Sequence, residues 1–199
     1  MKVIIAPAAF KNSLSATEVA GAIGRGLQRS KLHLTLHYIP IADGGNGTLE
    51  CFLARGGQRF SQLVEGPLGQ PVEAGWGMLA DGETAVIEMA LASGIELIEQ
   101  EQLNPLVAST YGTGQLLQAA LEHGARRIIV GMGGSATVDG GAGCLQALGV
   151  RLLDASGNDV PRGGGSLKLI QTIDASGLDP RWREVEVIIA SDVENPTLG

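Results

Sequence analysis

The chain has 199 residues, 30 of them glycine, and 44 % of it is hydrophobic. Glycine exceeds its usual share of about 7 %, yet it clusters instead of recurring at every third position, and the apolar content is too high for a disordered chain. The net charge of −7 excludes a broad electrostatic attraction to nucleic acid or anionic lipid. We expect a globular protein with many turns that binds neither nucleic acid nor a membrane.

The sequence shows no signal for export or for metal binding through cysteine. Its longest uncharged stretch, residues 102–121, is too polar to span a membrane. The N-terminal apolar run is too short for the core of a signal peptide. Cys51 and Cys144 have no CxxC or Cys/His spacing, which predicts neither a zinc site nor a disulfide. We therefore expect a cytoplasmic enzyme or binding protein.

The first 57 residues alternate between strand and helix patterns. Residues 2–6 form a β-branched run closed by Pro7, which predicts a buried strand. Ser15 and Glu18 match a capping box, and apolar residues then recur on one helical face, so we predict a helix over 15–29. The later elements of this part are a strand at 32–41 and a helix that follows the glycine-rich segment 43–47 and ends near Arg55.

Residues 58–99 have a different pattern, made of short β-like pieces. The Asp81-Gly82 pair between 72–79 and 84–89 predicts a hairpin. After Pro105 helices and strands alternate again. The elements predicted there are a helix at about 114–123, a strand at 127–130, a helix at about 141–148, and strands at 150–154 and 185–190.

Strands that alternate with helices are typical of a mostly parallel sheet covered on both faces. We therefore predict a three-layer α/β fold of the Rossmann or flavodoxin kind. Residues 1–57 and 104–199 would form its core, and 58–103 a β-rich insertion or second small domain. In such sheets ligands bind at the carboxyl ends of the strands.

The strongest local signal is the segment from Gly131 to Gly143, which has six glycines in thirteen residues and follows a predicted strand. Glycine allows backbone N–H groups to turn toward one point, and the next helix adds its positive end, so the segment suits a phosphate. The alternative is close packing of strand against helix. We favour phosphate binding because packing alone would need only one glycine.

Two similar segments precede other helices, Ala42 to Thr48 and Thr110 to Gly114. The first repeats the D-G-G-x-G pattern of Asp139 to Gly143. A bare carboxylate beside a phosphate would repel it. Asp43 or Asp139 therefore holds Mg²⁺, accepts a proton from an attacking hydroxyl, or caps its own helix.

Asp192 follows the last predicted strand as Asp43 follows an earlier one. Carboxylates at the ends of parallel strands would converge on one crevice, which supplies the metal, base and anion site that phosphoryl transfer needs. Lys11, after the first strand, is the cation expected to meet a substrate carboxylate or phosphate, and a solvated surface lysine is the alternative.

Two known nucleotide-binding motifs are alternatives to this pattern. No G-x-x-x-x-G-K-[ST] occurs, which excludes a P-loop NTPase at the level of the motif. Gly131, Gly133 and Ala136 do match a dinucleotide-binding pattern, with Asp154 at the end of the next strand. The turn-forming residues at 139–141 delay the start of the next helix, which argues against a dinucleotide site. A dehydrogenase stays an alternative function.

Several segments carry a resemblance to a known family. They are Ala6-Pro7-x-x-Phe10-Lys11-x-Ser13-Leu14-Ser15-Ala16, Ala42-Asp43-Gly44-Gly45-x-Gly47-Thr48, Gly66-Pro67-Leu68-Gly69, Ile87-Glu88-Met89-Ala90, Tyr111-Gly112-Thr113-Gly114, Gly133-Gly134-Ser135-Ala136-Thr137 and Asp192-Val193-x-Asn195-Pro196. Together, in order and over the whole chain, they closely resemble the bacterial glycerate kinase type 1 family. The resemblance implies ATP-dependent phosphorylation of D-glycerate to 2-phosphoglycerate, with Mg²⁺ and a two-part α/β fold.

The motifs and the resemblance together define the candidate residues. They are Asp43, Asp192 and Lys11 for catalysis, Asp43 and Asp192 for the metal, Gly112, Thr113, Gly114, Gly133, Gly134, Ser135 and Thr137 for ATP, and Lys11, Ser13, Gly44, Gly45 and Asp139 for the substrate. The expected partner is the small-molecule substrate D-glycerate, and the oligomeric state is left open, with a homo-oligomer as one outcome.

The chain departs from the family's usual residues at a few positions. Family members usually carry Asp-Ser at Ala8-Ala9, an acidic residue at Asn46 and Asn at Val138, so each position lacks a polar group here. Family members also continue beyond Gly199, so we expect part of the cleft to lie outside this chain. A degenerate or truncated anion-binding module without catalysis is therefore the alternative function.

Overall fold

The computed structural model describes residues 1–10 and 13–193 and has a mixed α/β fold. Its strands are β1 (Lys2–Ile5), β2 (Thr35–Tyr38), β3 (Gly57–Glu65), β4 (Pro71–Leu79), β5 (Thr84–Glu88), β6 (Arg127–Gly131), β7 (Arg151–Leu153), β8 (Thr172–Asp174) and β9 (Glu186–Ala190). Its α-helices are α1 (Ala16–Gln28), α2 (Thr48–Leu53), α3 (Ala90–Ser93), α4 (Tyr111–Glu122) and α5 (Ala142–Ala147). Four short 3-10 helices lie between these elements, at Ile95–Leu97, Gln100–Gln102, Gly164–Leu169 and Pro180–Glu184.

The main sheet has the strand order β3-β4-β5-β6-β9. The pairs β3–β4 and β4–β5 are antiparallel, whereas β5–β6 and β6–β9 are parallel. The predicted hairpin is confirmed: Asp81 accepts hydrogen bonds from the N–H groups of Glu83 and Thr84, and Gly82 has a φ of +71°. The sheet is thus mixed, which corrects the expectation of a mostly parallel one.

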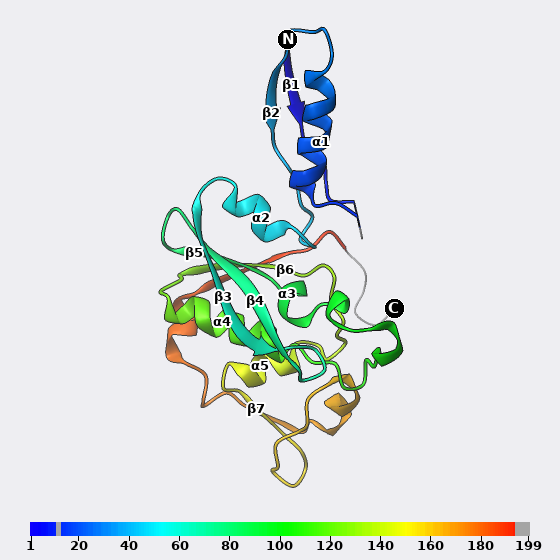
Figure 1. The fold of residues 1–199 in the computed structure, drawn as a ribbon. Helices are drawn as coiled ribbons and strands as arrows, with labels where there is room; N and C mark the ends of the chain where they lie inside the picture. The colour runs from blue at the N-terminus through cyan, green and yellow to red at the C-terminus, as the bar shows by residue number, and fades with distance from the viewer. Residues whose placement is uncertain (11–12, 194–199) are drawn as a thin grey trace.

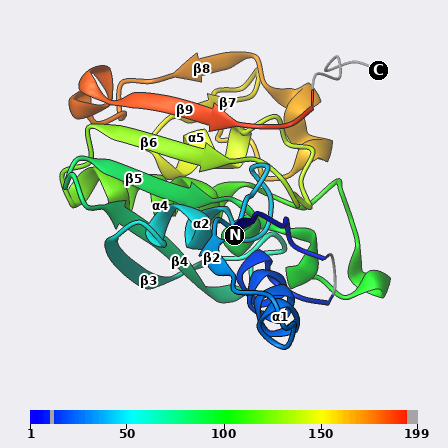
Figure 2. The same cartoon turned by 90° about the horizontal axis from the view of Figure 1, so that it is seen from above.

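Helices lie on both faces of this sheet (Figure 2). Trp76 of β4 packs in the main hydrophobic core with Leu116 of α4. The next residue along β4, Gly77, lies against Leu49 of α2. Because successive residues of a strand point to opposite faces, α2 and α4 cover opposite faces of the sheet.

A second, smaller unit projects from the body of the molecule (Figure 1). It consists of α1 and the parallel pair β1–β2. The predicted capping box is present, because Ser15 Oγ accepts from Glu18 N and Ser15 N donates to the Glu18 carboxylate. β1 is not the buried strand that we expected, since Ile4 is 66 % exposed.

The predicted domain boundary at 58–103 is not confirmed. β3, β4 and β5 belong to the main sheet, and β5 pairs with β6 along its whole length, from Thr84–Arg127 to Glu88–Gly131. The unit that stands apart is instead built from residues before α2 (Figure 1). None of the helices in the described part of the chain has the length and apolar character needed to cross a membrane.

Candidate functional site

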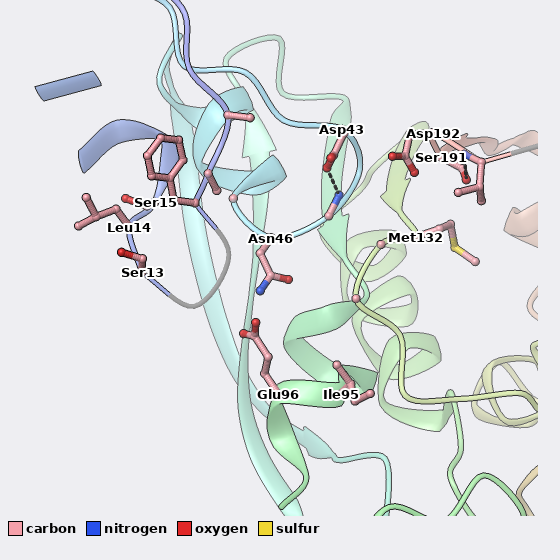
Figure 3. A pocket seen from close by; sticks show the side chains of 18 residues that line it. Ser13, Leu14, Ser15, Asp43, Asn46, Ile95, Glu96, Met132, Ser191 and Asp192 are labelled. Carbon is pink, nitrogen blue, oxygen red and sulfur yellow. Dashed lines mark hydrogen bonds between the residues drawn. The ribbon is translucent and has the colours of Figure 1, made fainter. Parts of the chain in front are cut away.

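A cavity of about 870 Å³ lies between the projecting unit and the main sheet (Figure 3). Its lining comes from the loops after β1, β2, β6 and β9 and from the turn after α3. The volume is within the range of roughly 300–1,000 Å³ that is usual for small-molecule sites. Parallel strands bring their carboxyl ends to one edge of a sheet, so residues from distant parts of the sequence meet here.

Six of the predicted site residues line this cavity. They are Ser13, Asp43, Gly45, Gly133, Gly134 and Asp192. Asp43 and Asp192 come from the loops after β2 and β9, and both side chains are exposed. Lys11 lies outside the described residues. The structure therefore brings together two loops that carry predicted carboxylates and one loop rich in glycine.

The loops 43–47 and 131–134 are in direct backbone contact. Gly133 N donates to Gly44 O over 2.9 Å, and Met132 N donates to Ala190 O over 3.1 Å. A Cβ on Gly133 would stand 2.5 Å from Gly45 Cα. These glycines therefore allow the loop 43–47, the loop 131–134 and the end of β9 to approach one another closely beside the cavity.

Gly44 is the most constrained residue of this contact, and its replacement by alanine should damage the fold. Its φ is +93°, and an added Cβ would overlap the carbonyl oxygen of Ala190. We expect Gly44→Ala to lower the free energy of unfolding by more than about 2 kcal/mol, measured by urea denaturation. Gly82→Ala is the matched control, because Gly82 also has a positive φ but no atom within 4 Å of the added Cβ. Equal effects of the two changes would contradict the contact.

The glycine-rich loop is not the open phosphate cradle that the sequence predicts. Met132 and Gly133 use their N–H groups within the protein, and Ala136 N donates to Ser93 O over 3.0 Å. Thr137 N donates to Ser135 Oγ over 3.0 Å, and the two hydroxyl groups lie 2.9 Å apart. Neither Ser135 nor Thr137 lines the cavity. Close packing thus accounts for most of this segment, which contributes Met132, Gly133 and Gly134 to the cavity wall.

The second expected cradle, Gly112 to Gly114, lies in the protein interior. Thr113 is 4 % exposed, and its hydroxyl is 2.8 Å from Ser93 Oγ. A Cβ on Gly112 would overlap Glu65 O, and one on Gly114 would overlap Cys144 O. These positions serve the packing of α4 against β3 and α5. Their burial gives no support to the assignment to ATP, which stays a prediction.

Asp139 is also buried, and its carboxylate is bonded within the protein. It is 1 % exposed, and its carboxylate accepts hydrogen bonds from the N–H groups of Thr110, Gly141 and Gly143 and from the Thr110 hydroxyl. These donors lie at the starts of α4 and α5. Both carboxylate oxygens thus accept hydrogen bonds within the protein, and the predicted contact of Asp139 with substrate stays a prediction.

Three carboxylates line the cavity: Asp43, Asp192 and Glu96. Asp43 Oδ1 accepts a hydrogen bond from Gly45 N over 3.1 Å. The other carboxylate oxygen, Oδ2, takes no part in this bond. In residues 1–10 and 13–193, no three metal-ligating side chains gather at one point. Mg²⁺ is usually held by one or two carboxylates together with waters and substrate phosphates. Asp43 and Asp192 are the candidate carboxylates for such a site.

Glu88 is a buried carboxylate that is not among the candidate residues predicted from the sequence, although it lies in the resembling segment Ile87-Glu88-Met89-Ala90. It ends β5, is 3 % exposed, and accepts hydrogen bonds from Gly47 N and Leu49 N. Burial raises the pKa of Glu88 above the ordinary glutamate value, and the two N–H bonds act against this rise. The available signal was a charged residue that directly ends an apolar strand.

The family model of the glycerate kinase family matches residues 3–199. The chain belongs to the glycerate kinase family. It is 53 % identical to the glycerate kinase of Bacillus subtilis (strain 168), over all of this chain and 52 % of that protein. It is 51 % identical to the glycerate 2-kinase of Escherichia coli (strain K12), again over all of this chain and 52 % of the relative. The chain thus spans about half the length of these relatives.

A solved structure agrees with membership of the glycerate kinase family. The crystal structure of a candidate glycerate kinase 2 from Salmonella typhimurium LT2 superposes with a TM-score of 0.85 at 47 % identity. The match covers 98 % of this chain and 53 % of the other. The sequence resemblance to this family is therefore confirmed.

The rival dinucleotide-binding interpretation has no support in the structure. Helix α5 begins only at Ala142, well after the glycines of the motif, and is six residues long. Asp154 accepts hydrogen bonds from Ser156 N and Asn158 N in an exposed turn after β7. Its carboxylate therefore closes a local turn and is not directed to a ribose.

Proposed function

We propose that this chain carries a substrate site of an ATP-dependent kinase that phosphorylates D-glycerate to 2-phosphoglycerate. The observation that carries the proposal is the placement of Asp43 and Asp192 on one cavity beside Gly133 and Gly134. The names of the relatives, glycerate kinase and glycerate 2-kinase, support this substrate class. The cofactors would be ATP and Mg²⁺.

The chemistry needs a base and a means to neutralise phosphate charge. In the proposed site one of the two carboxylates, Asp43 or Asp192, accepts the proton of the attacking glycerate hydroxyl. The other holds the magnesium ion, which offsets the charge of the phosphates when it is bound. Ser13 contributes a hydroxyl group on the side of the projecting unit and would donate a hydrogen bond to the substrate. Lys11 would meet the substrate carboxylate.

The position of the cavity between two units suits a ligand that both units contact. Its two walls belong to different units, the projecting β1–α1–β2 unit and the strand ends of the main sheet. A ligand held between them would contact both. Removal of water from such a site strengthens the electrostatic interactions within it.

Ligand binding and product formation together test the proposal. A ligand present at 100 times its Kd stabilises the folded state by about 2.7 kcal/mol, which for a chain of this size raises Tm by roughly 5–11 °C. We expect Mg·ATP and D-glycerate, but not NAD, to raise Tm, and we expect 2-phosphoglycerate to form when both substrates are present. Thermal unfolding monitored by circular dichroism and a chromatographic assay of the product are the measurements.

The other outcomes separate the alternative functions. Binding of D-glycerate or ATP without any product would favour an anion-binding module without catalysis. A rise in Tm with NAD alone would favour a dehydrogenase. If neither Mg·ATP nor D-glycerate changes Tm and no product forms, this proposal is wrong for the chain.

A further inference from the structure

Glu88 connects two parts of the molecule that are distant in the sequence. Its Oε1 lies 3.1 Å from Gly47 N, and its Oε2 lies 3.2 Å from both Gly47 N and Leu49 N. The glutamate is 3 % exposed. These N–H groups belong to the start of α2, 41 and 39 positions before Glu88. A carboxylate from the main sheet therefore holds the beginning of this helix.

Helix α2 has no side chain of its own for this task. Its N-cap is Gly47, with a φ of +91° and no side-chain cap bond. The first N–H groups of a helix lack partners within the helix and need an acceptor from elsewhere. Glu88 supplies that acceptor. It thereby fixes the end of the loop 43–47, whose Asp43 and Asn46 line the cavity.

The same strand end is also bonded to the strand that leads into the neighbouring loop of the cavity. Glu88 is paired with Gly131 across the β5–β6 ladder, and the following N–H, of Met89, donates to Gly131 O over 3.1 Å. Gly131 leads directly into Met132, Gly133 and Gly134, which line the cavity. Glu88 and the next residue, Met89, are thus bonded to the loop 43–47 and to Gly131, where the second loop begins.

Burial of the Glu88 carboxylate has an electrostatic cost for stability. The pKa of Glu88 is raised in the folded state, chiefly by burial and further by Glu50 on α2, although the bonds from Leu49 N and Gly47 N and the charge of Arg59 on β3 lower it. A carboxyl group whose pKa is raised in the folded state stabilises the fold least when it is ionised, so its cost is complete above the raised pKa and absent below the ordinary one. A neutral side chain of the same shape would avoid that cost.

We infer that Glu88 is a positioning residue of the proposed phosphoryl-transfer site. By holding the N–H groups of Gly47 and Leu49, it sets the place of the loop 43–47, and so of Asp43, relative to the loop 132–134. This inference rests on the proposed kinase function. Glu88 does not line the cavity and acts through the loop that it anchors.

Three variants test this role: Glu88→Gln, Glu88→Ala and, as a matched control, Glu50→Gln. Glu50 lies on the same helix but is exposed and paired with Arg59, and it does not line the cavity. Glutamine keeps the shape of Glu88 and one acceptor oxygen, so it guards against misfolding of the alanine variant. Hydrogen exchange of residues 43–53, kcat for D-glycerate phosphorylation and Tm at neutral pH are measured for each.

We expect amide exchange over 43–53 to become about tenfold faster in Glu88→Gln, and faster still in Glu88→Ala, with no change in β6. We expect kcat of Glu88→Gln to fall about tenfold, whereas its Tm stays equal to that of the wild type or rises. Glu50→Gln should match the wild type in exchange and kcat. A purely structural role would instead lower Tm and leave kcat per folded molecule unchanged, and that result would overturn the inference.

The exchange measurement separates failure of the inference from failure of the proposed function. If the wild type forms no product, the kinase proposal fails, and exchange alone decides whether Glu88 holds the loop 43–47. Faster exchange in Glu88→Gln than in Glu50→Gln supports that anchoring role. Equal exchange in the two variants refutes it, with or without activity.

Discussion

Replacement of Asp43 or Asp192 by asparagine should lower kcat for D-glycerate phosphorylation by about 100-fold or more. Asparagine keeps the size of the side chain but can neither accept the proton of the attacking hydroxyl at neutral pH nor offer a charged oxygen to magnesium. Both aspartates are exposed on the cavity, so Tm should change little. Steady-state formation of 2-phosphoglycerate and thermal unfolding are the two measurements.

Asp174→Asn is a suitable control for these variants. Asp174 is also an aspartate outside the core, and it ends β8. Its carboxylate accepts a hydrogen bond from Ser176 N, and it is not among the residues that line the cavity. Its replacement should leave kcat unchanged. Normal turnover in both Asp43→Asn and Asp192→Asn would contradict the assignment of base and metal ligand to these residues.

Asp139→Ala should have the opposite profile, a large loss of stability. The change leaves the N–H groups of Thr110 and Gly143 buried without their acceptor, and each such group costs about 1–3 kcal/mol. It also removes the acceptor of the half-buried Gly141 N–H. We expect the free energy of unfolding to fall by about 3 kcal/mol or more, and Tm by roughly 6–12 °C. Urea and thermal denaturation measure these quantities.

Asp154→Ala provides the comparison for this prediction. Asp154 accepts two backbone N–H bonds in its own turn, but the turn is exposed, and water can replace the lost acceptor. Its replacement should therefore have a small effect. If Asp139→Ala were as stable as Asp154→Ala, the burial and bonding that we describe for Asp139 would be refuted.

Local features of the fold were predictable because neighbouring residues produce them. The capping box at Ser15 and the Asp81-Gly82 turn are present as predicted. Helix α4 is followed by Gly124, with a φ of +87°, and α5 by Gly149, with a φ of +95°. Each of these depends on bonds or dihedral angles within a few positions of the chain.

Features that depend on distant pairing were not predictable in the same way. Residues 58–99 show a β pattern, but nothing in that pattern says that β5 joins β6 in one sheet. The glycines of loop 131–134 and of helix α4 are compatible with two interpretations, binding of a phosphate and close contact with another backbone segment. The neighbours, Gly44 O for one loop and Glu65 O for the other segment, are supplied by chain segments far away. Cytoplasmic location and oligomeric state stay predictions.

The two D-G-G-x-G segments show where the limit lies. The sequence by itself determined the local turn, since Asp43 accepts from Gly45 N and Asp139 from Gly141 N, two residues on in each case. Only the tertiary structure decided that Asp43 faces the cavity whereas Asp139 is buried. The reason is that a turn is closed by adjacent residues, whereas the solvent exposure of a carboxylate depends on which distant segments pack around it. For Asp139 that segment is the start of α4, which supplies Thr110.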